Sequence, residues 1–180
     1  MSFSNNSSVE YNLKICILGN LGVGKTSIVH RFTEGTFRTS YKRTIGVNLL
    51  SKDLKVEEYG EVKLRIWDIA GQQSFKTFHD KYLAGSDGAF VVFDVTDNSS
   101  FRKIGEWIES FRKVTIDNPI HLIGNKIDLK GSISVLEEGK SYAAEQKMKF
   151  TATSAKTGEN VENAFKELIR QILKKPKSFV

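Results

Sequence analysis

A glycine-rich octapeptide near the start of the chain has the composition and spacing of a phosphate-binding loop. Residues 19–26 read Gly-Asn-Leu-Gly-Val-Gly-Lys-Thr, after an apolar stretch and before a helical pattern of apolar residues. Glycines let several backbone N–H groups point at one phosphate, and the following helix presents its positive N-terminal end to the same anion. We therefore expect Lys25 to reach the β- and γ-phosphates of a nucleoside triphosphate and the Thr26 hydroxyl to coordinate Mg²⁺. The residues expected around the phosphates are Leu21, Gly22, Val23, Gly24, Lys25, Thr26 and Ser27.

A later segment carries groups that would read the base. Asn125, Lys126 and Asp128 follow an apolar stretch, which places them at the carboxyl edge of a sheet, where α/β proteins bind ligands. The Asp128 carboxylate would accept hydrogen bonds from the ring N–H and the amino group of guanine, a pair that adenine does not offer. Lys126 would lay its aliphatic stem over the base, and Asn125 would tie this segment to the phosphate loop.

The phosphate loop alone leaves an ATPase, a nucleotide kinase and a GTPase open. A second segment after a predicted strand, Ser154, Ala155 and Lys156, narrows the choice, because one of its backbone N–H groups would meet the guanine O6. Adenine carries an amino group in place of this oxygen, and a second donor would repel the backbone N–H. Together with Asp128, this segment favours guanine, and an adenine-nucleotide enzyme is the disfavoured alternative.

Candidate catalytic residues lie between these motifs. Asp68 ends an apolar stretch and is expected to hold Mg²⁺ through a water molecule, while Gly71 would bring its N–H to the γ-phosphate. Gln72 would orient the attacking water. Thr44, on a loop long enough to cover the site, would complete the Mg²⁺ shell with its hydroxyl and touch the γ-phosphate with its N–H. Hydrolysis would then release both loops together, as in a molecular switch.

Strands and helices alternate along the chain, which predicts an α/β fold with a mostly parallel sheet and helices on both faces. The link 57–61 is too short for a crossover helix, so the strands on either side of it form an antiparallel hairpin. Apolar residues at helical spacing predict helices within residues 101–111 and 161–173. The six expected strands are residues 13–18, 47–56, 62–68, 89–94, 121–125 and 149–153.

Length and composition agree with a single domain. With 180 residues and 39% hydrophobic content, we expect a flexible stub at residues 1–9, one domain at residues 10–173 and a basic tail at residues 174–180. No apolar run approaches the roughly 18 residues of a membrane span, and the first residues lack the pattern of a signal peptide. The expected location is cytoplasmic, with peripheral contact of the basic tail with a membrane left open.

Charge and cysteine content argue against other classes of protein. The net charge is +6, but basic and acidic residues are interleaved and no nucleic-acid-binding motif accompanies them, so no nucleic-acid partner is expected. The only cysteine, Cys16, excludes a disulfide within the chain. Its place in the first expected strand favours a buried apolar side chain over a reactive thiol.

These motifs, in this order, resemble those of the Ras superfamily of small GTPases, and the chain looks most like the Rab branch. The resemblance extends from about residue 11 to residue 173. Rab-like character comes from the segments 41–47, 63–68 and 92–96, which read Tyr-Lys-Arg-Thr-Ile-Gly-Val, Lys-Leu-Arg-Ile-Trp-Asp and Val-Phe-Asp-Val-Thr. The resemblance implies a G domain that binds GTP or GDP with Mg²⁺.

The resemblance also implies further features of the fold and the site. Phe37 would pack edge-on against guanine, Tyr41 would cover the ribose and phosphates, and the sheet order would be 2-3-1-4-5-6. An exchange factor, a GTPase-activating protein and effectors would bind the two switch loops, in a monomer that acts in membrane trafficking.

The chain departs from the family pattern in several places. Leu21 stands where a small residue is common, and its side chain would crowd the space that Gln72 and an activating arginine use, so slow hydrolysis is expected. Ile69 replaces the usual Thr, Gln73 the usual Glu and Leu49 a Phe of the typical effector face. The sequence also ends without the cysteines that are normally prenylated, so either it is truncated or the protein has no lipid anchor.

Two functional hypotheses follow. The first is a switch that turns GTP and water into GDP and phosphate. The alternative, favoured by Leu21 alone, is a scaffold that holds GTP with negligible hydrolysis.

Overall fold

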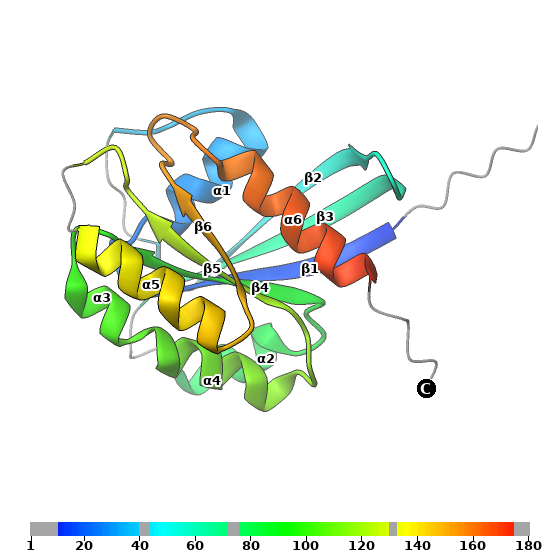
Figure 1. Cartoon of the computed structure of the whole chain (residues 1–180). Helices are drawn as coiled ribbons and strands as arrows, with labels where there is room; N and C mark the ends of the chain where they lie inside the picture. The colour runs from blue at the N-terminus through cyan, green and yellow to red at the C-terminus, as the bar shows by residue number, and fades with distance from the viewer. Residues whose placement is uncertain (1–10, 40–43, 72–75, 130–132, 175–180) are drawn as a thin grey trace, which may run out of the picture.

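A six-stranded sheet forms the centre of the computed structural model, and helices cover both of its faces (Figure 1). The structure describes residues 11–39, 44–71, 76–129 and 133–174. The strands are β1 (Tyr11–Leu18), β2 (Val47–Val56), β3 (Gly60–Ile69), β4 (Gly88–Asp94), β5 (Ile120–Asn125) and β6 (Lys149–Thr153). The helices are α1 (Lys25–Glu34), α2 (Lys76–Leu83), α3 (Asn98–Arg102), α4 (Ile104–Val114), α5 (Ile133–Glu145) and α6 (Val161–Lys174).

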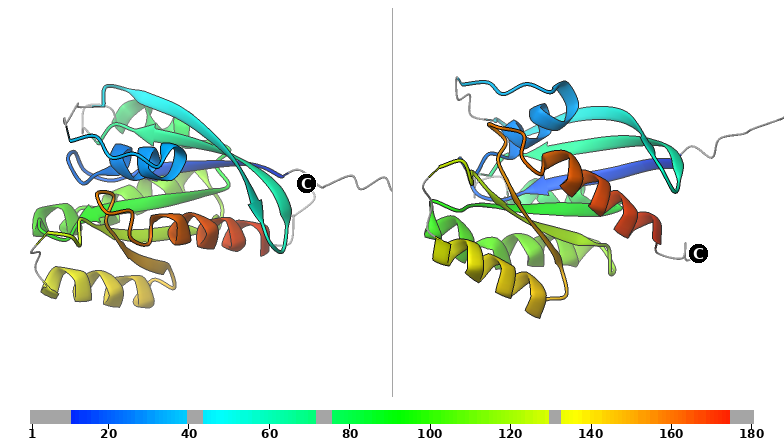
Figure 2. Two further views of the ribbon diagram at one scale, coloured as in Figure 1. Left: turned by 90° about the horizontal axis from the view of Figure 1, so that it is seen from above. Right: turned by 45° about the horizontal axis from the view of Figure 1, so that its top comes forward.

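The strand order is β2-β3-β1-β4-β5-β6, as the family resemblance implies. β2 pairs antiparallel with β3, and the other neighbours pair in parallel, which confirms the predicted hairpin. The hairpin link is shorter than predicted, because Gly60 already pairs with Val56 and thus belongs to β3. Its tip lies beside the C-terminal part of α6 (Figure 2), where Arg170 Nε is 3.1 Å from Glu58 Oε2.

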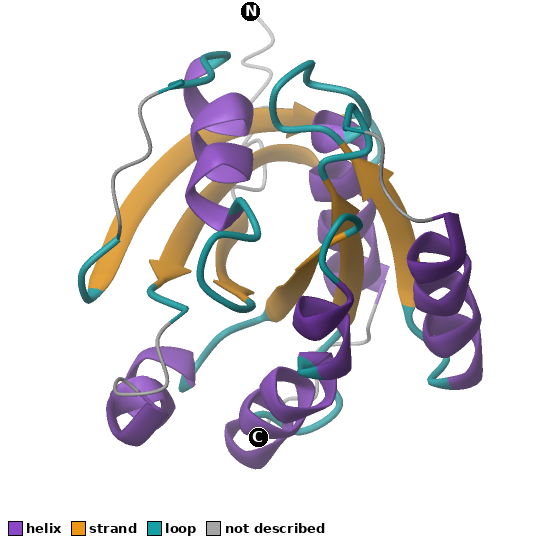
Figure 3. Ribbon diagram, turned by 90° about the vertical axis from the view of Figure 1, so that its left-hand side faces the viewer, coloured by secondary structure: helices purple, strands orange, loops and turns teal. Residues whose placement is uncertain are grey.

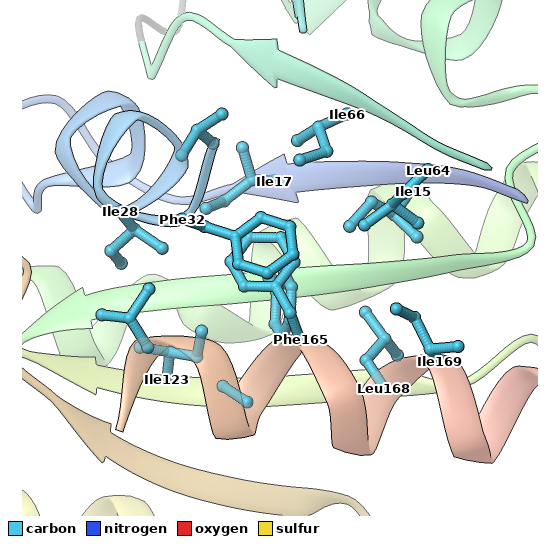
Figure 4. Close-up of a cluster of buried hydrophobic side chains, with 14 of the residues drawn as sticks. Ile15, Ile17, Ile28, Phe32, Leu64, Ile66, Ile123, Phe165, Leu168 and Ile169 are labelled. Atoms are coloured by element: carbon cyan, nitrogen blue, oxygen red, sulfur yellow. The ribbon is translucent and has the colours of Figure 1, made fainter. Parts of the chain in front are cut away.

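α1 and α6 cover one face of the sheet. The apolar stripe of α6 and that of α1 meet over β1, β3 and β4, and the rings of Phe32 and Phe165 stack at the middle of this layer with centroids 3.7 Å apart (Figure 4). β1 contributes Leu13, Ile15 and Ile17 to the same layer, because alternate side chains of a strand point to one face. The core thus fixes α1, whose first residue closes the phosphate loop.

The opposite face carries α2, α3, α4 and α5. Cys16 and Leu18 point from β1 into this second layer, where they join apolar residues of these helices. Cys16 is fully buried, and its burial raises the pKa of the thiol to about 11, so the predicted apolar role is confirmed. Of the helices in the described residues, none is long and apolar enough to cross a membrane.

The segment predicted as one helix around residues 101–111 is divided. α3 ends at Arg102 and α4 begins at Ile104, with Lys103 between them at φ −98° and ψ 0°. Phe101, Ile104, Ile108 and Phe111 all join the second layer, so the spacing of apolar residues correctly predicted their burial. Apolar spacing alone did not reveal the break, because both short helices use the same face.

Replacing Phe165 by Ala should lower the free energy of unfolding by about 3–5 kcal/mol, because the change removes a fully buried ring that stacks on Phe32. Urea unfolding followed by circular dichroism measures this loss. The matched control is Lys166→Ala on the same helix, whose side chain pairs with Glu162 near the surface and whose loss should cost under about 1 kcal/mol. Equal losses for the two variants would contradict the assigned core.

Candidate nucleotide-binding site

A cavity of about 850 Å³ lies at the carboxyl ends of the parallel strands. Figure 3 looks onto this end of the sheet. The cavity brings together residues from the phosphate loop, the loop before β2 and the loops after β3, β5 and β6. The predicted residues that line it are Leu21, Gly22, Gly24, Lys25, Thr26, Ser27, Phe37, Thr44, Gly71, Asn125, Lys126, Asp128, Ala155 and Lys156.

The phosphate loop is shaped by a glycine that must lie against another part of the site. Gly24 precedes α1 in a left-handed conformation, with φ 99°. A Cβ atom at this position would lie 2.3 Å from Asn125 Nδ2, so a larger residue would push the two loops apart. The sequence therefore needs glycine here for both conformation and space.

Lys25 lies at the base of the loop with its amino group directed back along it. Its Nζ donates hydrogen bonds to the carbonyl oxygens of Gly19 (2.8 Å) and Asn20 (2.9 Å). Burial lowers the pKa of Lys25 to about 8, although the Asp68 carboxylate opposes this shift. The negative charge of a phosphate beside this amino group would favour its protonated form and would thus offset the effect of burial.

Three oxygen-bearing side chains meet beside Lys25. Thr26 Oγ1 donates to Asp68 Oδ2 at 2.6 Å and is 2.7 Å from Thr44 Oγ1. Burial raises the pKa of Asp68, while the Thr26 hydrogen bond and Lys25 lower it. Asp68 Oδ1 is buried and has no hydrogen-bond partner in the described part of the chain. Hydroxyl and carboxylate oxygens with one unsatisfied atom fit Mg²⁺, which prefers oxygen ligands.

At the other end of the cavity, Asn125 joins the base-reading segment to the phosphate loop. Its Nδ2 donates to the Val23 carbonyl at 2.9 Å, which is the contact expected from the sequence. Its Oδ1 accepts hydrogen bonds from Thr153 Oγ1 at 3.1 Å and from the Ala155 N–H at 3.2 Å. One buried side chain therefore connects three loops that are distant in the sequence.

Asp128 is held by a neighbour from the other base-reading segment. The Ser154 hydroxyl donates to Asp128 Oδ1 at 2.6 Å. Ser154 is fully buried and does not line the cavity, so it lies behind Asp128. Val23 also lies behind the lining, where its side chain belongs to the core and its carbonyl accepts from Asn125. These two residues can support the site and do not themselves face the cavity.

Arg31 is a residue of the site that the sequence motifs did not reveal. From α1 it donates to the carbonyl oxygens of Ala155 (2.9 Å), Lys156 (2.5 Å) and Gly35 (2.7 Å). The guanidinium thus joins the base-reading turn to the end of α1, from which the chain leads on to Phe37 at the cavity wall. Nothing local in the sequence distinguishes Arg31 from an ordinary exposed arginine.

Gly71 lies directly against the phosphate loop. A Cβ atom on it would be 2.4 Å from the carbonyl carbon of Asn20 and 2.5 Å from the Leu21 nitrogen. The Asn20 side chain is in turn anchored to α4, because Trp107 Nε1 donates to its Oδ1 at 2.9 Å. Leu21 lines the cavity and is 44% exposed, so its side chain is free to reach the space above the loop.

Two predicted residues lie outside the described part of the chain. They are Tyr41, expected at the ribose and phosphates, and Gln72, expected to orient water. Their roles stay predictions. The described lining adds residues that were not among the predicted site residues, namely His30, Arg38, Thr39, Ile45, Val47, Asn48 and Leu129.

Comparison with known proteins agrees with this geometry. The model of the Ras family matches residues 14–174. The chain belongs to the Ras family. It is 40% identical over 166 residues to the Ras-related protein Rab11E of Lotus japonicus, an alignment that covers 91% of this chain and 75% of the relative. It is 39% identical over 169 residues to the GTP-binding protein YPT1 of Saccharomyces cerevisiae, covering 93% of this chain and 82% of the relative.

The Ras-related protein Rab-18 of Lymnaea stagnalis is 40% identical over 166 residues, which cover 91% of this chain and 82% of that protein. These relatives place the chain in the Rab branch of the small GTPases, as the motifs indicated. This Rab-branch protein therefore binds guanine nucleotide and is a GTPase.

The pKa of Lys25 predicts how nucleotide affinity changes with pH. With a pKa of about 8, the amino group is charged mainly below that pH, whereas a bound phosphate would favour the charged form. The affinity for GDP should therefore be constant below about pH 8 and should fall by up to about tenfold per pH unit above it. Equilibrium titration with a fluorescent GDP analogue between about pH 7 and about pH 9 measures this change.

The control for this experiment is Lys25→Arg, because a guanidinium stays protonated across this range. This variant should bind more weakly but should show a smaller loss of affinity above about pH 8, since the group that titrates in the wild-type protein is then absent. The same loss in both proteins would show that Lys25 is not the titrating group.

Proposed function

We propose that this Rab-branch GTPase is a membrane-trafficking switch that binds GTP or GDP with Mg²⁺ in the described cavity and slowly hydrolyses GTP to GDP and phosphate. The observation that carries the proposal is the hydrogen bond from Asn125 Nδ2 to the Val23 carbonyl. It holds the base-reading segment against the phosphate loop, so one cavity offers groups suited to both ends of the same nucleotide.

At the phosphate end, the backbone of the loop and the Lys25 amino group would bind the β- and γ-phosphates. Thr26, Thr44 and Asp68 would hold Mg²⁺, Asp68 through a water molecule, and this ion would neutralise charge on the phosphates. The hydrogen bond from Thr26 to Asp68 and the contact between the two threonine hydroxyls support this assignment. Asp68 Oδ1, which has no partner among the residues that the structure describes, supports it as well, because a buried oxygen needs a donor or a cation.

Hydrolysis would require a water molecule placed in line with the γ-phosphate, and Gln72 is the proposed group that orients it. Thr44 and Gly71 would each offer an N–H to the γ-phosphate. Both lie at the cavity wall, Thr44 between α1 and β2 and Gly71 between β3 and α2. Loss of the γ-phosphate would remove a contact from both loops at once, and this is how nucleotide state would reach a partner protein.

At the base end, Asp128 would accept two hydrogen bonds from guanine while Ser154 keeps its carboxylate in place. The Lys126 stem and the Phe37 ring would contact the base. The Ala155 N–H, which donates to Asn125 Oδ1 at 3.2 Å, would also meet the guanine O6. Tyr41 would cover the ribose.

Leu21 is the feature that argues for slow turnover. Its half-exposed side chain lines the cavity beside the proposed place of the phosphates, where Gln72 and an arginine from an activating protein would act. A permanent GTP scaffold is the alternative reading of the same residue. The relationship to the Rab branch favours the switch, so we assign the effect of Leu21 to the rate of hydrolysis.

Partner proteins would recognise the surface next to Thr44. Ile45 and Leu49 are exposed apolar side chains there, 82% and 54% accessible, on the loop and strand that follow it. An exchange factor, an activating protein and effectors are the proposed partners of this surface and of the loop after Gly71. We propose a monomer that is cytoplasmic and associates peripherally with membranes.

Asp128→Asn tests the assignment of the base-binding end. The variant should bind GDP at least about 100-fold more weakly and should gain preference for xanthosine diphosphate, because the Asn amide would donate to the oxygen that replaces the guanine amino group. Competition titration with both nucleotides measures the change. Asp53→Asn, an exposed substitution on β2, is the control and should leave both affinities unchanged. Retained preference for guanosine would reject the assignment.

Leu21→Ser tests the proposed cause of slow hydrolysis. The smaller side chain should raise the single-turnover rate of phosphate release by roughly tenfold, because Gln72 would regain space to place water. Leu49→Ser removes an exposed leucine outside the cavity and should not change this rate. The gain should disappear when Leu21→Ser is combined with Gln72→Leu. A gain that persists in the combined variant would mean that Leu21 does not act through Gln72.

A further inference from the structure

Asp94 is a buried carboxylate at the site edge that no step described above uses. It is the last residue of β4 and is 6% exposed. In the sheet it lies opposite Asn125, and the next residue, Val95, donates its N–H to the Asn125 carbonyl. The register of β4 and β5 therefore places Asp94 directly beside the segment that would read the base.

The two oxygens of Asp94 have separate partners. Oδ2 lies 2.6 Å from Lys126 Nζ, a pair in which the aspartate is almost buried and the lysine is about one-third exposed. Oδ1 accepts hydrogen bonds from the Thr96 N–H at 2.8 Å and the Thr96 hydroxyl at 2.6 Å. The Asp94 N–H donates to Ser100 Oγ at 2.9 Å. Thr96, in the same turn, thus binds one carboxylate oxygen of Asp94, and the other oxygen binds Lys126.

Lys126 itself is constrained at both ends of its side chain. Its backbone has φ 72°, a left-handed conformation that costs free energy in a residue with a Cβ atom and persists only where the surroundings enforce it. Its amino group is fixed by Asp94. Lys126 lines the cavity, and its aliphatic stem runs between these two fixed points. A lysine stem in free solution has many rotamers, so such fixation removes an entropy cost that nucleotide binding would otherwise carry.

We propose that Asp94 is a positioning residue for guanine nucleotide: it holds the Lys126 ammonium so that the lysine stem is already in place to contact the base when the nucleotide binds. The proposal rests on the base-binding role of Lys126 proposed above. Asp94 does not line the cavity, so we place it outside direct contact with the nucleotide. Its effect is carried entirely through the ion pair with Lys126.

A purely structural role for Asp94 is the alternative, because its Oδ1 also organises the turn that contains Thr96. Asp94→Asn separates the two roles. An asparagine retains an oxygen that can accept both Thr96 hydrogen bonds, but it presents an uncharged amide to the Lys126 ammonium. The turn should therefore survive while the ion pair is lost.

The experiment measures the release of a fluorescent GDP analogue from the full-length protein in the presence of Mg²⁺. Asp94→Asn and Lys126→Ala should each accelerate release by about tenfold, and the double variant should be no faster than Lys126→Ala alone. Asp97→Asn is the matched control, because this exposed aspartate caps α3 from the same turn and has no contact with Lys126. It should leave release unchanged.

A second measurement monitors the opposite end of the site. The single-turnover rate of hydrolysis, started from protein already loaded with GTP, should change by a smaller factor in Asp94→Asn than the release of GDP does, since the hydrogen bonds of Lys25 and Thr26 do not involve the ion pair. A change in hydrolysis as large as the change in release would overturn the proposal. An equal acceleration of release by Asp94→Asn with and without Lys126 would overturn the proposal, as would unchanged release in Asp94→Asn. Unchanged release in Lys126→Ala would instead reject the base-binding role of Lys126 itself.

Lys126→Met provides the test if Asp94→Asn does not fold. Methionine retains the apolar stem and removes only the ammonium, so the proposal expects release to be accelerated as in Asp94→Asn. Wild-type release from Lys126→Met would show that the ion pair does not position the stem, and would overturn the proposal.

Discussion

The hydrogen bond from Asn125 to the Val23 carbonyl is the contact on which the site depends. It joins two residues that are 102 positions apart in the sequence and holds the end of β5 against the phosphate loop. It forms only because Gly24 has no side chain between the two loops. The parallel pairing of β1, β4 and β5 brings both loops to one edge of the sheet, and this hydrogen bond holds them in contact. With it, a nucleotide of fixed length can reach both.

Buried charge makes this site sensitive to its ligand. Lys25 and Asp68 lie near each other, and burial disfavours the charged form of each. Their mutual attraction and the hydroxyl of Thr26 offset part of that cost. A phosphate beside the lysine and a cation beside the aspartate would offset the rest. The protein thus keeps in its core two ions that are best satisfied when nucleotide and metal are both present.

Supporting contacts connect this site to the surrounding helices. Arg31 joins α1 to the turn that carries Ala155, and Trp107 joins α4 to Asn20 of the phosphate loop. In both cases a side chain from a helix binds a loop that would contact the nucleotide. A change of loop conformation would therefore alter the contacts of α1 and α4. The hydrophobic layers fix both helices on the sheet. Asp94 and Lys126 provide a similar connection between neighbouring strand ends.

The sequence by itself determined the elements and motifs that are contiguous in the chain. The phosphate loop, the apolar strands and the segments around Asp128 and Ser154 leave a local pattern, because spacing within a strand, helix or turn follows from backbone geometry. Only the tertiary structure decided which side chains support these motifs. Arg31, Asp94 and Trp107 act on partners that lie up to 125 residues away or on a neighbouring strand. Such pairs depend on strand register and helix placement, which no short stretch of sequence encodes.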